Sequence, residues 1–183
     1  VAVHEATGNT HGLTWVRAFE VATRGARGED EAAPGLVAWL VESAAALSAN
    51  DVTVEALAAA AAAELESAPE ESRRLLALLD QTPGGRRVPI YARRLPLMLR
   101  VALTAGDTEL ARRLAGGIEF RYPLHQHALC TARAQLAEHE GDQAGAAELY
   151  RDAAARWHQF GNVSEHAYAL LGEGRCLSAL GDP

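Results

Sequence analysis

His125, His127 and Cys130 lie within one short stretch, and these residue types bind metals or take part in nucleophilic catalysis. On a helix, His127 and Cys130 are neighbours, three positions apart. A metal centre needs three or four converging ligands, for which His166 and Cys176 are the remaining candidates. No second pair has ligand-like spacing, and no stretch indicates an oxyanion-binding loop for a cysteine nucleophile. The pattern therefore favours a small buried Cys130 and histidines near a helix end or surface, and it predicts no metal site.

The basic residues restrict the chemistry further, since all seventeen are arginine and the chain has no lysine. A phosphate-loop lysine or a Schiff-base lysine is therefore excluded in this chain. The glycine pairs at 84–85 and 116–117 follow no predicted strand, so they indicate turns rather than a phosphate cradle. Carboxylates such as Glu138, Glu165 and Glu173 fit solvated helix faces. We predict a protein that is not an enzyme and that binds no cofactor.

The charge distribution argues against nonspecific nucleic-acid binding, because the net charge is −7 at pH 7. Residues 1–80 carry thirteen acidic residues and five arginines, whereas residues 81–106 carry five arginines and no acidic residue. The basic stretch either faces the acidic half within the fold or offers a surface to an acidic partner. Two cysteines make no disulfide framework, and no apolar run reaches membrane-spanning length. We expect a cytoplasmic protein without direct contact to nucleic acid or membrane.

The apolar periodicity and the breaks predict an all-α chain of about eight or nine helices. The alternation that is typical of strands is almost absent. Within the helical segments, Asp51 or Thr53 is expected to cap a helix and Pro96 to kink one. We expect four segments: a disordered lead-in over 1–12, N-terminal helical repeats over 13–81, a loop or hinge over 82–89, and regular helix pairs over 90–183.

The dipeptide Gly-Asp recurs at 106, 141 and 181, each time at the end of a helix-forming run. Glycine adopts the left-handed conformation that closes one helix, and aspartate accepts the free amides that open the next. A turn this short places the two helices antiparallel. The recurrence therefore predicts a solenoid of antiparallel helix pairs.

The middle unit resembles the tetratricopeptide repeat, whose period is about 34 residues. The repeat's small, glycine, small, aromatic, small pattern matches this chain at Ala134, Gly141, Ala146, Tyr150 and Ala153. The unit departs from the pattern in lacking a large aromatic early in its first helix and in carrying histidine at the terminal proline position. The first and third units match in part.

Residues 121–183 are also similar to the C-terminal repeat regions of large actinobacterial signalling proteins. In those proteins a nucleotide-cyclase-like or LuxR-type helix–turn–helix module accompanies a P-loop ATPase and a tetratricopeptide-like tail. The resemblance implies the sensing or assembly arm of such a regulator. The chain does not begin with methionine, and its last helix at 163–180 has no partner after Gly181, so we expect a truncated arm whose apolar face is covered by further chain or by a second copy.

The tetratricopeptide resemblance also implies a concave groove lined at fixed offsets before each turn glycine. Three arginines on one face could hold carboxylates of an extended peptide, although Arg93 and Arg100 could instead pair with the acidic N-terminal half. The chain is therefore expected to be a scaffold that binds a peptide, a partner protein or neighbouring domains of its parent chain. A small-molecule effector-binding domain is the alternative, and a homodimer through the last helix is a further expectation. The candidate groove residues are Arg93, Arg100, Gln135, His139, Tyr168 and Arg175, with Thr131, Glu138 and Leu171 at further offsets.

Overall fold

The computed structural model describes residues 5–6, 8–26, 34–119 and 122–181. Within these ranges the chain is all-helical and contains no strand, which confirms the predicted all-α class. The helices are α2 (Thr10–Ala26), α3 (Pro34–Ala46), α4 (Asn50–Glu64), α5 (Pro69–Asp80), the 3-10 helix η1 (Gly85–Arg87), α6 (Pro89–Thr104), α7 (Thr108–Ala115), α8 (Pro123–His139), α9 (Gln143–Phe160) and α10 (Val163–Leu180). The expected lead-in falls partly outside the described residues, and α2 already begins at Thr10.

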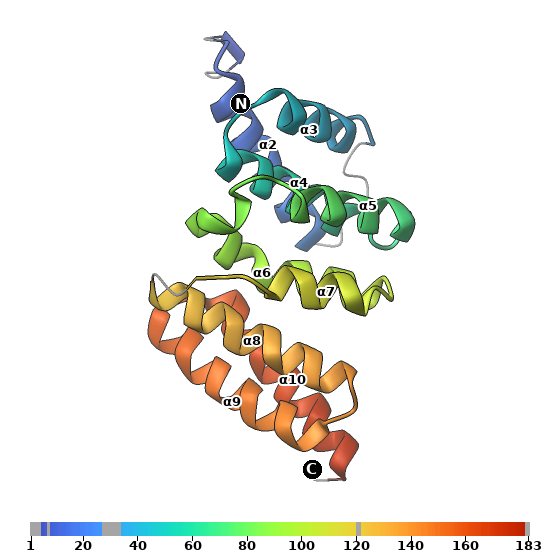
Figure 1. Ribbon diagram of the computed structural model, residues 1–183, viewed down its shortest axis with the longest axis vertical. Coiled ribbons are helices and arrows are strands. Elements are labelled where there is room, and N and C mark those ends of the chain that lie inside the picture. The colour runs from blue at the N-terminus through green and yellow to red at the C-terminus, as the bar shows by residue number, and fades with distance from the viewer. Residues whose placement is uncertain (1–4, 7, 27–33, 120–121, 182–183) are drawn as a thin grey trace.

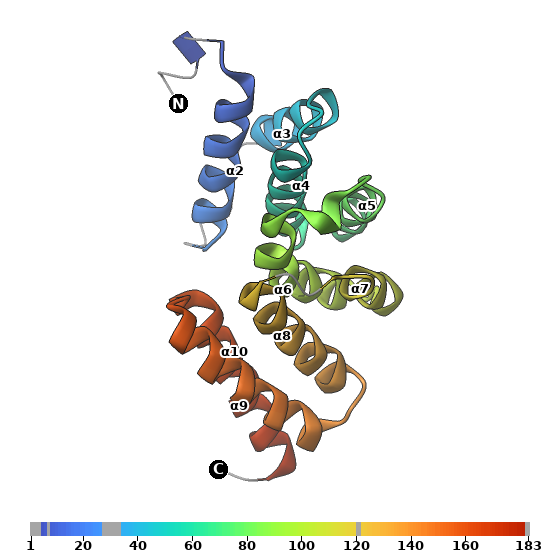
Figure 2. The same cartoon turned by 60° about the vertical axis from the view of Figure 1, so that its left-hand side comes forward.

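The helices stack along the long axis of the molecule, from α2 at one end to α9 and α10 at the other (Figure 1). Alternate helices contact each other directly, α2 with α4, α4 with α6 and α6 with α8. At the C-terminal end α10 packs on α9 and also contacts α8. In the turned view, α2 and the α9–α10 pair project to the same side of α4 and α6 (Figure 2). The stack is therefore curved.

The Gly-Asp turns at 106 and 141 have the geometry that the sequence predicts, whereas Asp182 of the third lies outside the described residues. Gly141 has a φ of +89°, in the left-handed region that glycine adopts without strain. The Asp142 N–H donates to the Ala137 carbonyl at 3.0 Å, which closes α8. The Asp142 carboxylate accepts the Gly145 N–H at 2.9 Å, which opens α9. The turn at Gly106 has the same pair of bonds.

A further turn of this kind lies at Gly161-Asn162, just before the helix expected over 163–180, and its cap was not predicted because the capping residue is asparagine. The Asn162 N–H donates to the Trp157 carbonyl at 3.0 Å, and its Oδ1 accepts the Glu165 N–H at 3.1 Å. Asparagine caps a helix about as well as aspartate. The turn joins α9 to α10, so cap chemistry in general, and not the Gly-Asp dipeptide alone, marks the helix junctions.

Alanines form the contact between α8 and α9. Ala134, Ala146 and Ala153 are completely buried, and their small side chains let the two helix axes approach. Trp157 is buried beside them, and its indole N–H donates to the Thr131 hydroxyl of α8 at 2.7 Å. The small-and-aromatic pattern of this unit therefore serves helix packing.

Close packing also explains a glycine inside α10. A Cβ built on Gly172 would lie 2.5 Å from Cζ of Tyr150, which is much shorter than a normal carbon–carbon contact. The α10 backbone therefore passes directly beside the Tyr150 ring of α9. The large ring of Tyr150, the aromatic position of the repeat pattern, is accommodated because residue 172 has no side chain.

The N-terminal half is organised around α4, which contacts α2, α3, α5 and α6. The expected caps are wrong here, since the N-cap of α4 is Ala49 and makes no side-chain cap bond. Asp51 lies in the first turn, and the Thr53 hydroxyl donates to the Ala49 carbonyl at 3.1 Å. Packing on four neighbouring helices, rather than a local cap, therefore determines where α4 begins.

Within the described residues, two arginines of the basic stretch pair with acidic residues of the first 80 positions. Arg94 donates to the fully buried Glu55 of α4, with an Nε–Oε2 distance of 2.6 Å. Arg86 pairs with Asp80. A third, Arg100, pairs instead with Glu165 near the C-terminal end. Three arginines of the basic stretch are therefore paired within the fold, with acidic residues from both halves of the chain.

Candidate binding pocket

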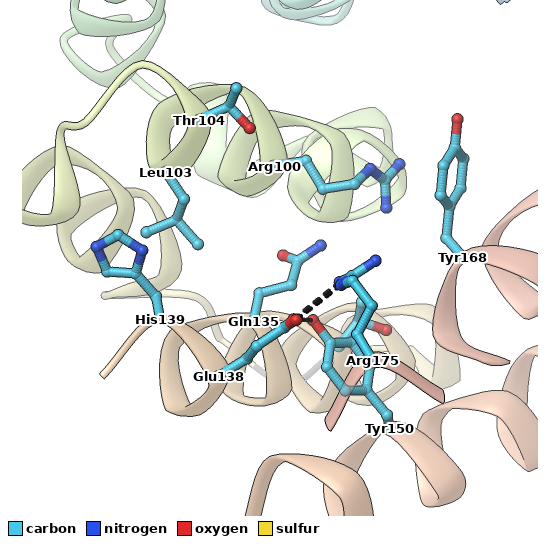
Figure 3. Close-up of a pocket in the computed structure, with 10 residues that line it drawn as sticks. Arg100, Leu103, Thr104, Gln135, Glu138, His139, Tyr150, Tyr168 and Arg175 are labelled. Atoms are coloured by element: carbon cyan, nitrogen blue, oxygen red, sulfur yellow. Dashed lines mark hydrogen bonds and ion pairs between the residues drawn. The ribbon is translucent and has the colours of Figure 1, made fainter. Parts of the chain in front are cut away.

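A pocket of about 410 Å³ opens between α6, α8 and α10 (Figure 3). Helix α6 contributes the upper wall, α8 the floor, and α10 with one residue of α9 the side. Its lining residues are Arg100, Leu103, Thr104, Thr131, Gln135, Glu138, His139, Tyr150, Tyr168 and Arg175.

The structure brings five of the six candidate groove residues to this pocket and leaves one outside it. The lining includes Arg100, Gln135, His139, Tyr168 and Arg175. Arg93 is exposed on α6 and does not line it. Arg93 and Arg100 share a helix face, but two turns of helix separate them by about 10 Å. Arg100, Gln135 and Arg175 each stand six positions before a turn glycine, which places them on corresponding faces of the alternate helices α6, α8 and α10.

Arg100 connects α6 to the start of α10. Its two terminal nitrogens donate to the two carboxylate oxygens of Glu165 at 2.9 and 2.8 Å. Its guanidinium carbon also lies 3.9 Å from the centre of the Tyr168 ring, a favourable cation–π distance. Both partners come from α10, and the ion pair is mostly buried. The pocket wall at this end is therefore held by a two-bond pair.

Glu138 connects α8 to α9 and α10. It accepts two hydrogen bonds from Arg175, both at 2.8 Å, and one from the Tyr150 hydroxyl at 2.6 Å. Burial alone would raise the pKa of Glu138, but the bonds from Arg175 and Tyr150 outweigh it and lower the pKa. Burial, followed by the bond to Glu138, raises the pKa of Tyr150, so its hydroxyl stays protonated and donates.

Within the described part of the chain, one side-chain hydrogen bond holds each of Gln135 and His139. The Gln135 Nε2 donates to the Pro96 carbonyl of α6 at 3.1 Å. The Gln135 Oε1 is buried and accepts no hydrogen bond within the described residues. The His139 Nε2 lies 2.8 Å from the Thr108 hydroxyl, which holds the ring at the pocket edge.

Several residues of the site were not expected from the sequence. Leu103 and Thr104 stand three and two positions before Gly106, the same offsets as Glu138 and His139 before Gly141, but they were not among the candidates. Tyr150 was assigned only to the repeat pattern. Glu165 was interpreted as a solvated carboxylate, yet its side chain is only 10% exposed and holds Arg100. No local signal identifies this role, because the two residues are 65 positions apart.

The histidine–cysteine stretch lies apart from the pocket and has a packing environment. The Cys130 Sγ lies 3.4 Å from Asp152 Oδ2. Burial, supported by that carboxylate, raises the pKa of Cys130 to about 11, so the thiol is protonated at neutral pH. The ring of His127 makes edge contacts with Trp157 and Phe160, and burial lowers its pKa. Within the described ranges, no three His, Cys, Asp or Glu side chains are grouped to hold a metal ion.

Comparison with known proteins adds no assignment. No family model matches the chain, and neither a curated protein nor a solved structure matches it. Among the helices of the described part, none is both long enough and apolar enough to cross a membrane. The all-α fold and the pocket geometry therefore carry the functional argument.

Proposed function

We propose that this chain is a non-enzymatic interaction scaffold that binds an extended peptide in the pocket between α6, α8 and α10. The single observation behind the proposal is that groove positions on three alternate helices meet around one cavity of about 410 Å³. The bound segment would come from a partner protein or from a neighbouring domain of the parent chain. On this proposal the scaffold is the tetratricopeptide-like arm of a cytoplasmic signalling ATPase or transcriptional regulator of the actinobacterial type.

The repeated turns support the tetratricopeptide-like reading. Gly106, Gly141 and Gly161 close α6, α8 and α9 with the same left-handed geometry, and the residue after each caps the next helix. The small residues Ala134, Ala146 and Ala153 pack where the repeat pattern requires close approach. An array built from such units presents a concave surface to extended segments.

Selection from a display library of random twelve-residue peptides tests the proposal. Thr104 is exposed on the pocket rim, so Thr104→Trp fills the pocket mouth without disturbing the core. Ala155→Trp, at an exposed α9 position outside the lining, is the matched control. We expect enrichment by the wild type and by Ala155→Trp that is lost with Thr104→Trp. Enrichment that Thr104→Trp leaves unchanged would reject the pocket as the peptide site.

The pocket volume supports a second candidate function, a small-molecule effector domain. Ligand pockets occupy about 300 to 1,000 Å³, and a cavity of about 410 Å³ falls within that range. A thermal-shift screen against a metabolite library tests this candidate. We expect a hit to raise the melting temperature of the wild type and not of Thr104→Trp. Absence of any pocket-dependent hit, beside peptide enrichment, would favour the scaffold.

The exposed face of α10 supports self-association as a further property of the scaffold. Leu170 and Leu180, which lie on neighbouring sides of the helix, are 48% and 53% exposed, although they are large apolar side chains. We propose that a second copy covers this face in a homodimer. Light-scattering mass across a concentration series tests it, with Leu170→Gln and Leu180→Gln as variants. A dimer that both substitutions dissociate supports the proposal, and a wild-type monomer at all concentrations rejects it.

A further inference from the structure

Gln135 has an unused hydrogen-bonding atom at the wall of the pocket. The residue is only 5% exposed. Its Nε2 donates to the Pro96 carbonyl, which fixes the orientation of the amide group. Its Oε1 is buried and accepts no hydrogen bond within the described residues. A buried amide oxygen without a donor is unfavourable, so the pocket lacks one hydrogen-bond donor.

The side chain is aimed at the cavity. Figure 3 shows Gln135 extending from α8 toward α6, into the space between Leu103 and Arg100. Because Oε1 itself is covered, a donor reaches it only when a neighbouring side chain turns aside. In Figure 3 the amide oxygen of Gln135 points to the side of Leu103, and the amide nitrogen to the side of Arg100 and Arg175.

The two arginines of the pocket still offer hydrogen bonds, although their charges are compensated. A guanidinium carries five N–H donors. Arg100 uses Nη1 and Nη2 for Glu165, and Arg175 uses Nε and Nη2 for Glu138. Further N–H groups on each remain for an acceptor on a ligand. The pocket therefore requires an acceptor for a guanidinium and a donor for Gln135.

Charged groups satisfy only half of this requirement. A carboxylate supplies acceptors alone and would lie beside the carboxylate of Glu138. An ammonium supplies donors alone and would meet the guanidiniums of Arg100 and Arg175. A secondary amide carries a carbonyl and an N–H in one uncharged group. The polypeptide main chain presents this group at every residue except proline.

We propose that the pocket recognises an uncharged secondary amide of a peptide main chain. The amide N–H donates to Gln135 Oε1, and the carbonyl accepts from Arg100 or Arg175. This inference rests on the proposed function and deepens it, because it selects the main chain rather than an acidic side chain as the recognised group. It replaces the carboxylate ligand expected from the arginines, since both arginines of the pocket already hold carboxylates.

Three small probes separate these chemistries by fluorine NMR titration: para-fluoro-N-methylbenzamide, methyl para-fluorobenzoate and para-fluorobenzoate. The amide and the ester have nearly the same shape, but only the amide has an N–H. We expect the amide to bind the wild type about tenfold more tightly than the ester, as one additional buried hydrogen bond implies. In Gln135→Met, which keeps the length of the side chain and removes the acceptor, we expect this preference to vanish.

The controls distinguish recognition from stability. Losing the bond to Pro96 changes the melting temperature of Gln135→Met, but it has no reason to change the ratio between amide and ester. Thr104→Trp should abolish binding of both probes. Equal binding of amide and ester, tightest binding of the benzoate, or no binding at all would each overturn the inference.

The outcomes also separate this inference from the function on which it rests. Pocket-dependent peptide enrichment without an amide preference would support the scaffold function and reject the role of Gln135. Amide-selective binding without peptide enrichment would reject the peptide scaffold but support the amide-binding role of Gln135.

Discussion

The two ends of the molecule achieve helix packing by different means. At the C-terminal end, the junctions into α7, α9 and α10 each have a polar residue that caps the next helix with its side chain. At the N-terminal end, α4 and α5 follow Ala49 and Ala68, which make no side-chain cap bonds. There α4 is surrounded by four helices and carries a fully buried glutamate. Helix ends are thus encoded locally at one end and by tertiary packing at the other.

The largest effect should come from the buried ion pair of the N-terminal end. Glu55 is fully buried and pairs with Arg94, so Glu55→Ala leaves a mostly buried guanidinium without its partner. We expect a loss of about 3 to 5 kcal/mol in unfolding free energy, measured by urea denaturation. Glu70→Ala, which breaks an exposed pair with Arg73, is the control and should change little. A small effect for Glu55→Ala would show that α4 does not depend on this pair.

A smaller but still clear effect is expected where α10 crosses α9. Gly172→Ala places a Cβ against the Tyr150 ring, and we expect a destabilisation of about 1 to 3 kcal/mol from overpacking. Gly174→Ala, on the same helix, meets no atom within 4 Å and should stabilise by about 0.5 to 1 kcal/mol. Opposite signs in denaturation would support the close contact. Equal effects would contradict it.

Substitutions at helix caps can remove a cap at the C-terminal end and introduce one at the N-terminal end. Asp142→Ala removes the cap of α9 and should cost about 1 kcal/mol. Ala68→Asp introduces a cap before α5 and should stabilise the N-terminal end by up to about 1 kcal/mol. Thermal unfolding of both variants measures this. If Ala68→Asp brings no gain, the start of α5 is already determined by packing.

The smallest effect concerns acid sensitivity at the pocket. Because Arg175 and Tyr150 lower the pKa of Glu138 in the folded protein despite its burial, ionised Glu138 stabilises the fold above its unfolded pKa. That contribution is lost as the pH falls from the ordinary glutamate value of 4.5 through the lowered folded value. We expect the stability of Glu138→Gln to depend less steeply on pH in this window. Identical slopes would contradict the pairing.

Sequence reasoning succeeded where the signal is local. The dipeptide Gly141-Asp142 predicts a helix junction, because these two residues supply the groups that close α8 and open α9. It failed at Ala49, where no local group marks the start of α4. It also placed Arg93 with the pocket residues, although α6 extends it two turns beyond the cavity. Helical offsets predict which residues share a face and leave open how far along the helix a cavity reaches.

The sequence by itself determined the all-α class, the Gly-Asp turns, and the shared faces of α6, α8 and α10, because helix periodicity and cap chemistry act over a few neighbouring residues. Only the tertiary structure decided that Arg100 holds Glu165, that Gln135 reaches Pro96, and that Gly172 accommodates Tyr150. The first two of these contacts join residues 65 and 39 positions apart. Contacts over such separations depend on how the helices stack, and many pairings are compatible with the same local pattern.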